Sequence, residues 1–261
     1  MACPFVLTIV NMNKVISFAV INSFWNVGTP LQRIIPTGCG SLDEQLKGGL
    51  PEGTLSLLYG EAETGKTTLA IQCAVNCARM GYKTIFIDCD GTFSPKRMAQ
   101  VARDDFDKVA PQIILMQPED FDQQAVVVER LDEYISERVG LIVVDTVTGL
   151  YRERLGDVMQ RNFALNRELN RQMACLAQIT KTRKVASLVI SQVRSLVSAE
   201  EETVQPVATR VLKFWADTTI TLQPTAQTKV IKAVVETRAE KRPTKLVLLK
   251  IEERGLSDYR G

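Results

Sequence analysis

Residues 60–67 read GEAETGKT, and this segment is the strongest indication of the fold in the sequence. It matches the pattern G-x-x-x-x-G-K-[ST], in which two glycines let the backbone approach phosphate oxygens closely. An apolar segment, residues 54–59 (TLSLLY), precedes it, and residues 67–79 have helical spacing and good helix formers. A strand, a glycine-rich loop and a helix in this order predict a phosphate-binding loop at a helix N-terminus.

The residues expected to bind a nucleotide follow from this pattern. Lys66 would reach the β- and γ-phosphates, and the Thr67 hydroxyl would bind Mg²⁺. Asp145 ends the apolar segment LIVVD, where a carboxylate can hold the magnesium shell. The sequence therefore predicts ATP and Mg²⁺ as cofactors. The expected phosphate-binding residues are Gly60, Glu61, Ala62, Glu63, Thr64, Gly65, Lys66, Thr67 and Thr68.

Hydrolysis needs a group that orients or deprotonates the attacking water. Asp88 and Asp90, in the segment IDCDG, are the candidates, and solvated loop acids are the alternative interpretation. Gln192 follows an apolar segment at residues 185–191, where its amide could sense the γ-phosphate and act as a switch. A simple polar strand end is the alternative for Gln192.

The alternation of apolar segments and helical spacing continues along the chain. Strands are predicted at residues 84–88, 112–116, 140–145 and 185–191, and helices at 94–102, 120–136 and 161–182. Ser94 is the expected N-cap of its helix, with Pro95 at the first position. Three strand-like segments, 218–222, 229–237 and 245–252, follow without long helices between them. We therefore expect an α/β fold with a largely parallel central sheet flanked by helices and with antiparallel C-terminal strands.

The composition limits the class of protein. A net charge of +2 over 261 residues excludes a strongly basic nucleic-acid coat. The absence of histidine excludes His-based triads and the common His-containing zinc sites. The six cysteines form no CxxC pair and are expected to be buried thiols in a reducing cytoplasm.

Residues 1–33 are apolar but are interrupted by several asparagines, which disfavours a membrane span. We expect an extension there, or a start codon placed too far upstream of Met12, and an ATPase domain over residues 34–261.

Four segments resemble the RecA-type recombinase ATPases. Within that family, the resemblance is closer to the short archaeal relatives of the recombinase RadA. The four segments are residues 36–70 (PTGCGSLDEQLKGGLPEGTLSLLYGEAETGKTTLA), 87–102 (IDCDGTFSPKRMAQVA), 165–172 (LNRELNRQ) and 189–193 (VISQV). The resemblance implies a RecA-like P-loop core and an accessory role in homologous recombination and DNA repair. It assigns catalysis to Asp90, Gln192 and Lys66. The family commonly has glutamate where Asp90 stands, so slow hydrolysis is expected.

The resemblance also implies partners. Full recombinases of this type carry a helix-hairpin-helix domain and a Phe-x-x-Ala polymerisation motif, and we find neither in this sequence. We therefore do not expect a filament, although a homo-oligomer stays open. The expected partners are single-stranded or branched DNA, bound without sequence specificity, and a RadA-type recombinase or other repair proteins. No membrane partner is expected.

In RecA-like proteins two loops approach DNA, one after the Asp145 strand and one after the Gln192 strand. The first carries Arg152, Arg154 and Arg161, although interleaved acids allow a merely solvated face. The second carries three adjacent glutamates at residues 200–202, which oppose phosphate binding or contact a protein instead.

The C-terminal segment supplies further cations, including Lys241 and Arg242. They could face DNA, reach the γ-phosphate of a neighbouring subunit, or belong to a plain exposed hairpin. Two other functions remain open at this point. One is a KaiC-like regulatory ATPase that does not act on DNA, and the other is a non-hydrolysing ATP-dependent scaffold for a recombinase.

Overall fold

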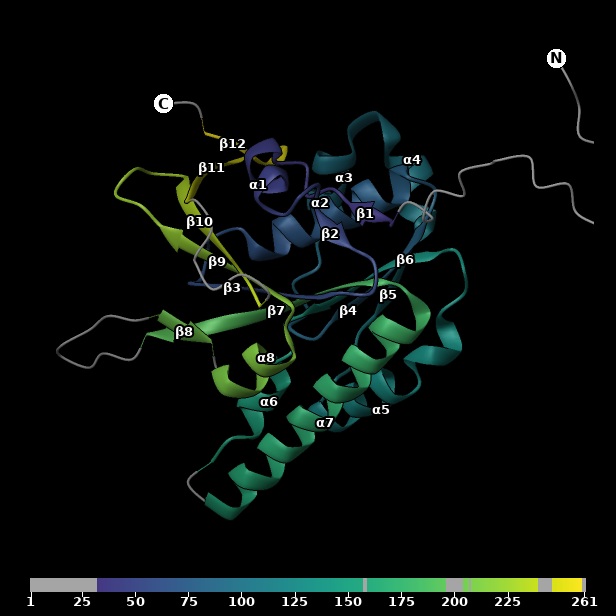
Figure 1. Cartoon of the computed structure of the whole chain (residues 1–261), viewed down its shortest axis with the longest axis vertical. Helices are drawn as coiled ribbons and strands as arrows, with labels where there is room; N and C mark the ends of the chain where they lie inside the picture. Colours follow the sequence, from purple (N-terminus) through teal and green to yellow (C-terminus); the bar gives the residue numbers. More distant parts are fainter. Residues whose placement is uncertain (1–31, 157–158, 196–203, 207, 239–245, 260–261) are drawn as a thin grey trace, which may run out of the picture. The chain divides into compact units, whose positions relative to one another are not determined.

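Strand β3 (Leu55–Gly60) lies inside a ten-stranded sheet and carries the glycine-rich loop at its C-terminal end. The computed structural model describes residues 32–156, 159–195, 204–206, 208–238 and 246–259. The strand order is β12-β11-β10-β9-β3-β7-β6-β4-β5, and β8 pairs with β7 (Figure 1). Strands β9, β3, β7, β6, β4 and β5 are parallel to one another, whereas β10, β11 and β12 are antiparallel. The expected sheet, with antiparallel C-terminal strands, is confirmed.

The other strands of this sheet have the following bounds. They are β4 Lys83–Asp88, β5 Ile113–Met116, β6 Val139–Asp145, β7 Ala186–Ser195, β8 Val204–Pro206, β9 Thr218–Pro224, β10 Val230–Thr237, β11 Val247–Glu252 and β12 Gly255–Asp258. Two short strands, β1 (Ile34–Ile35) and β2 (Leu50–Pro51), pair separately.

Helices cover both faces of the sheet, as Figure 1 shows. The helices are α1 Gly40–Gln45, α2 Lys66–Arg79, α3 Pro95–Ala102, α4 Phe106–Val109, α5 Phe121–Glu129, α6 Gly149–Arg154, α7 Met159–Arg183 and α8 Thr209–Trp215. Helices α1 to α4 enclose one apolar core with the sheet, and α5 to α8 enclose the other. Every residue of β3 and β6 is buried, because both faces of these strands are covered.

Helix α3 begins as the sequence predicts. The Ser94 hydroxyl accepts a hydrogen bond from the Arg97 N–H at 3.2 Å, and Pro95 occupies the first turn. The predicted helix over residues 120–136 is wrong in its second half. Helix α5 ends at Glu129, and a 3₁₀ turn at Leu131–Tyr134 follows, which lets Leu131 reach full burial.

The last strand, β12, was not predicted, and it closes over the helix that follows the glycine-rich loop. The buried amide of Gln72 donates to the Leu256 carbonyl at 3.1 Å and accepts from the Leu256 N–H at 2.9 Å. Asp258 accepts from the N–H and hydroxyl of Ser41, at the start of α1. These contacts attach the C-terminal hairpin to α1 and α2.

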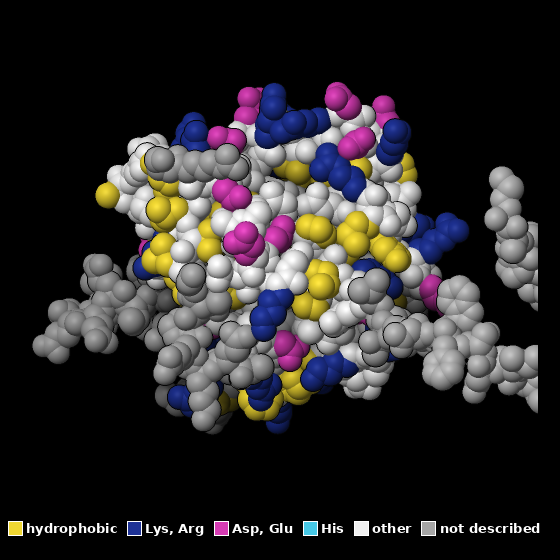
Figure 2. Space-filling view, turned by 45° about the horizontal axis from the view of Figure 1, so that its top comes forward, with side chains coloured by type: hydrophobic (Ala, Val, Ile, Leu, Met, Phe, Trp, Pro, Cys, Tyr) yellow, Lys and Arg dark blue, Asp and Glu magenta, His cyan; other side chains and the backbone are white. Residues whose placement is uncertain are grey.

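Surface properties agree with the near-neutral composition. On the face shown in Figure 2, positive and negative side chains are interspersed.

Cysteines 39, 73, 77 and 89 are buried and unpaired, and burial raises the pKa of Cys39 to about 12. Within the described ranges, no helix is both long and apolar enough to cross a membrane. Most of the expected extension, residues 1–31, lies outside the described residues.

Candidate nucleotide-binding site

The predicted site residues meet at one edge of the sheet, where the parallel strands end. Gly60, the last residue of β3, pairs with Gln192 on β7, and Asp88 on β4 pairs with Asp145 on β6. Gln192 was expected at a strand end, but β7 continues to Ser195, so this residue lies within the strand. Its backbone lies beside Gly60, where the glycine-rich loop begins.

The glycine-rich loop has the backbone that phosphate binding requires. A side chain at Gly60 would overlap the carbonyl oxygen of Leu222 on the neighbouring strand. Gly65 has a φ of +83°, which favours glycine, and α2 begins at the next residue. The first N–H groups of a helix have no intrahelical acceptor, so they can donate to an anion.

Lys66 lies at the start of α2 and is buried. Its ammonium group donates to the Glu61 carbonyl at 2.5 Å. Burial lowers the pKa of Lys66, and the nearby carboxylates of Asp145, Glu61 and Asp90 oppose this shift. A cation held beside the loop in this way can move to a phosphate oxygen when a nucleotide enters.

Asp145 is 1% exposed, and neither of its carboxylate oxygens has a hydrogen-bond partner among the described residues. Burial raises its pKa to about 7. The carboxylates of Asp90 and Asp88 raise this pKa further, whereas the nearby Thr67 hydroxyl and Lys66 lower it. Neither of these two groups forms a hydrogen bond with an Asp145 oxygen. Two unsatisfied buried oxygens are costly, and hydrated Mg²⁺ supplies the donors that they lack.

A magnesium ion at this site would need ligands from the nucleotide as well as from the protein. In the described part of the chain, no group of three or more Cys, Asp and Glu side chains could hold an ion alone. Mg²⁺ commonly uses one or two protein ligands together with phosphate oxygens. Asp145 and the Thr67 hydroxyl fit that arrangement.

Asp88 and Asp90 have different surroundings. Asp88 is fully buried and accepts from the N–H groups of Thr92 and Phe93 and from the Gln117 amide. It therefore holds the loop that follows β4. Asp90 is partly exposed, and burial raises its pKa while the Thr146 hydroxyl and Arg152 lower it. Of the two acids, Asp90 is the one with access to a water molecule.

A chain of hydrogen bonds leads from Asp90 into the segment after β6. The Thr146 hydroxyl donates to Oδ2 of Asp90 at 2.9 Å, and the Gln192 amide donates to the same oxygen at 3.3 Å. Arg152, on α6, donates to Oε1 of Gln192 at 2.5 Å. The side-chain amide of Gln192 thus links Asp90, the candidate catalytic acid, to Arg152, one of the arginines expected to contact DNA.

Two buried glutamines that the sequence did not single out hold the segment after Asp145. Gln124, on α5, donates to the Val147 carbonyl at 3.1 Å and to Oε1 of Gln172, on α7, at 2.8 Å. The Val147 N–H donates to the Ile190 carbonyl of β7. No local pattern signals these roles, because the partners come from distant segments.

The candidate DNA residues are not equivalent. Arg154 forms an ion pair with Asp122 on α5 at 2.6 Å, so its charge is already compensated. Arg161 is exposed and forms no ion pair with any described carboxylate. Lys241, Arg242 and the three glutamates at residues 200–202 lie outside the described residues.

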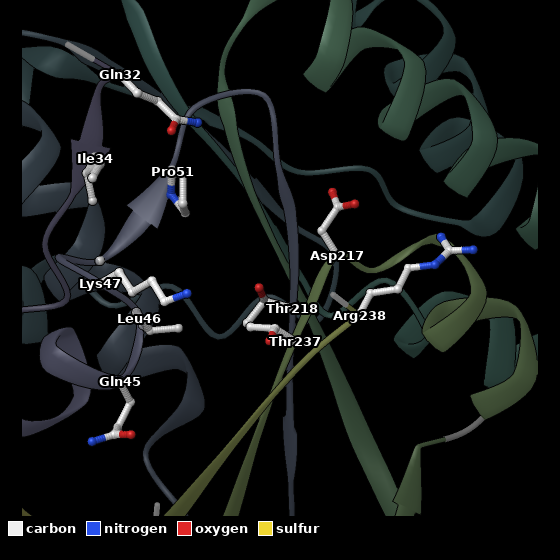
Figure 3. Close-up of a pocket in the computed structure, with 11 residues that line it drawn as sticks. Gln32, Ile34, Gln45, Leu46, Lys47, Pro51, Asp217, Thr218, Thr237 and Arg238 are labelled. Carbon is white, nitrogen blue, oxygen red and sulfur yellow. The ribbon is translucent and has the colours of Figure 1, made fainter. Parts of the chain in front are cut away.

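A separate cavity of about 520 Å³ lies at the opposite end of the sheet (Figure 3). Thr218, which begins β9, and Thr237, which ends β10, line it together with Leu46 and Pro51. Thr218 pairs with Ser56, four residues before Gly60, which is roughly 13 Å along β3. Its lining also includes Asp217 and Arg238, and it lies apart from the glycine-rich loop.

Comparisons with known proteins agree with this geometry. The family model for Rad51 matches residues 32–259. A protein of Methanosphaera stadtmanae named DNA repair and recombination protein RadB is 27% identical over 225 residues, 85% of this chain and 95% of the relative. A protein of the same name from Methanococcoides burtonii is 33% identical over 189 residues, 72% of this chain and 82% of the relative. A solved structure described as the crystal structure of the RadB recombinase has a TM-score of 0.73 and 29% identity, covering 87% of this chain and 100% of that chain. These matches confirm the resemblance expected from the sequence.

Proposed function

Because the chain belongs to the Rad51 family, we propose that it is an ATP-binding, slowly hydrolysing accessory protein in DNA recombination and repair. Residues 34–261 would form the ATPase domain. DNA, bound weakly and without sequence specificity, and a RadA-type recombinase would be its partners. The names of its relatives, which refer to DNA repair and recombination, support this assignment.

The observation that carries the proposal is the hydrogen-bonded chain from Asp90 through Gln192 to Arg152. One end of the chain lies at the sheet edge beside Asp145 and the glycine-rich loop. The other end lies on α6, which leads into the first candidate DNA segment. A change at the phosphates that moves Gln192 would therefore alter the place of Arg152, and DNA bound near Arg152 would alter Gln192.

Each site residue has a proposed role in this reaction. Lys66 would leave the Glu61 carbonyl and neutralise the β- and γ-phosphates. Thr67 and Asp145 would hold Mg²⁺, which when bound balances charge on the phosphate oxygens. Asp90 would orient the attacking water and accept its proton. Gln192 would report whether the γ-phosphate is present.

The distribution of paired and unpaired arginines indicates which surface would bind DNA. On the α5 side of α7, four arginines are neutralised by carboxylates; these are Arg130, Arg154, Arg171 and Arg183. Near the start of α7, Arg161 and Arg167 are exposed and unpaired with any described carboxylate. Unpaired cations are free to neutralise DNA phosphates, and these two continue the first candidate DNA segment, so the start of α7 is the favoured surface.

The deciding experiment is ATP turnover with and without single- and double-stranded DNA, with Lys66→Ala as the inactive control. We expect slow release of phosphate that depends on Mg²⁺ and changes when DNA is added. Turnover that DNA leaves unchanged, together with no DNA binding at low salt, would favour a regulatory ATPase that does not act on DNA. ATP binding without phosphate release above the Lys66→Ala control would favour a scaffold.

A further inference from the structure

Gly149, the first residue of α6, lies directly against the carboxylate of Asp90. A β-carbon built on Gly149 would overlap Oδ1 of Asp90 and would lie 2.9 Å from its Cγ. Gly149 itself has no left-handed backbone angle that would require glycine. The close approach of the Asp90 side chain is therefore the physical reason for a glycine at this position.

Three residues contact the carboxylate, and we call them the Asp90 niche: Thr146, Gly149 and Gln192. Oδ2 accepts from the Thr146 hydroxyl at 2.9 Å and from the Gln192 amide at 3.3 Å. Oδ1 points to the bare Cα of Gly149. Because the two oxygens are rigidly linked, a group that displaces Oδ1 also disturbs the two hydrogen bonds at Oδ2.

We propose that Gly149 is a positioning residue for Asp90, and that the niche is sized for an aspartate. The inference rests on the proposed function, in which Asp90 handles the attacking water. A methyl group at position 149 would force the carboxylate out of the niche and away from Thr146 and Gln192. A misplacement of about 1 Å at a reacting group can reduce a rate by about 100-fold.

The niche also accounts for the residue type at position 90. A glutamate is one methylene longer, and its carboxylate would extend past the two donors that hold Oδ2. Gly149 and Asp90 therefore form a matched pair, in which the small residue on α6 makes room for the short acid after β4. Gln192 connects this pair to Arg152, so the placement of the acid also determines where the switch amide rests.

A double-mutant cycle tests the placement without any nucleotide. The four proteins are the wild type, Gly149→Ala, Asp90→Ala and the double variant. We expect Gly149→Ala to lower the midpoint of urea unfolding much more in the wild type than in the Asp90→Ala background, where only the 3.2 Å approach to the Thr146 hydroxyl remains. Equal shifts in both backgrounds would overturn the proposal. If Gly149→Ala alone does not fold, recovery of folding in the double variant supports the overlap, and failure of both variants to fold overturns it.

Single-turnover phosphate release then tests the effect on chemistry. We expect about 100-fold slower release for Gly149→Ala at saturating Mg·ATP, with ATP affinity changed less than about threefold. In the Asp90→Ala background the same substitution should have no further effect. Unchanged release in a folded Gly149→Ala protein would overturn the positioning role. If the wild type itself releases no phosphate, the proposed hydrolysis fails, and the unfolding cycle still decides whether Gly149 places Asp90.

Discussion

Arg152 donates a hydrogen bond to Oε1 of Gln192, and the amide nitrogen of the same side chain donates to Asp90. The two bonds use opposite ends of one amide, so Gln192 cannot rotate for one partner without losing the other. Arg152 also donates to the Thr148 carbonyl, which fixes the guanidinium to the segment after β6. In the proposed switch, the Asp90 end and the Arg152 end are therefore linked.

The first prediction concerns that link. Gln192→Ala removes both hydrogen bonds but leaves Lys66, Thr67 and Asp145 in place. ATP affinity should therefore change less than about threefold, while the effect of DNA on turnover should disappear. The measurement is phosphate release over a range of single-stranded DNA concentrations. A Gln192→Ala protein whose turnover still responds to DNA as the wild type does would contradict the coupling.

The second prediction concerns the buried carboxylate of Asp145. Its pKa is raised from 3.8 to about 7, so the folded state binds the proton more tightly than the unfolded state does. Stability is therefore lost as pH rises from about 4 to about 7, and the loss stays constant above that range. A difference of about 3 pKa units corresponds to at most about 4 kcal/mol.

Asp145→Asn removes this loss. Without Mg²⁺ or nucleotide, the variant and the wild type should be equally stable near pH 4, and the variant should be more stable at pH 8. Urea unfolding in EDTA across this pH range measures the difference. Parallel stability curves would refute the assignment. Added Mg·ATP should stabilise the wild type more than the variant, because the amide lacks the charge that holds the magnesium shell.

The third prediction concerns Arg103, the residue directly after α3, which has φ +55° and ψ −127°. This backbone region favours glycine and costs other residues about 1–3 kcal/mol. Arg103→Gly should therefore stabilise the protein by about 1 kcal/mol, after the larger backbone entropy of glycine in the unfolded chain is deducted. Arg103→Ala is the matched control, because it removes the same side chain but keeps the β-carbon. Equal urea midpoints for the two variants would exclude strain as the cause.

The fourth prediction separates unpaired from paired arginines. Replacing Arg161 and Arg167 by alanine should weaken binding of single-stranded DNA and lower the slope of log affinity against log salt by about 1.4, or about 0.7 per phosphate contact. Replacing Arg130 and Arg183 is the control, since both are exposed but paired with Glu133 and Asp132. Arg161 and Arg183 lie about 33 Å apart along α7. Equal losses from the two double variants would argue against a localised DNA surface.

The parts of the fold that could be predicted from sequence depend on neighbours in the chain. The P-loop needs only an apolar strand, two glycines and a helix in succession, and the cap of α3 needs only Ser94 and Pro95. The end of α5 could not be predicted, because helical spacing continues to residue 136. There the burial of Leu131 in the 3₁₀ turn prevails over spacing.

The missed parts of the site depend on residues far apart in sequence. Asp122 compensates Arg154 across 32 residues, and Gln172 meets Gln124 across 48. Nothing in the sequence around Gly149 indicates why a glycine stands there, because Asp90 contacts it only in the folded protein. Such pairings arise from the sheet order, and a single sequence does not contain the distances that would reveal them.

The double hydrogen bond between Gln72 and Leu256 has a consequence for how the protein is made. The two residues are 184 positions apart, so at about 5–20 residues per second a ribosome needs roughly 10–40 s to reach the second after the first. Throughout that interval α2 lacks strand β12, whose Leu256 backbone forms both hydrogen bonds with the buried amide of Gln72. The buried face of the helix after the glycine-rich loop is therefore completed long after that loop has been translated.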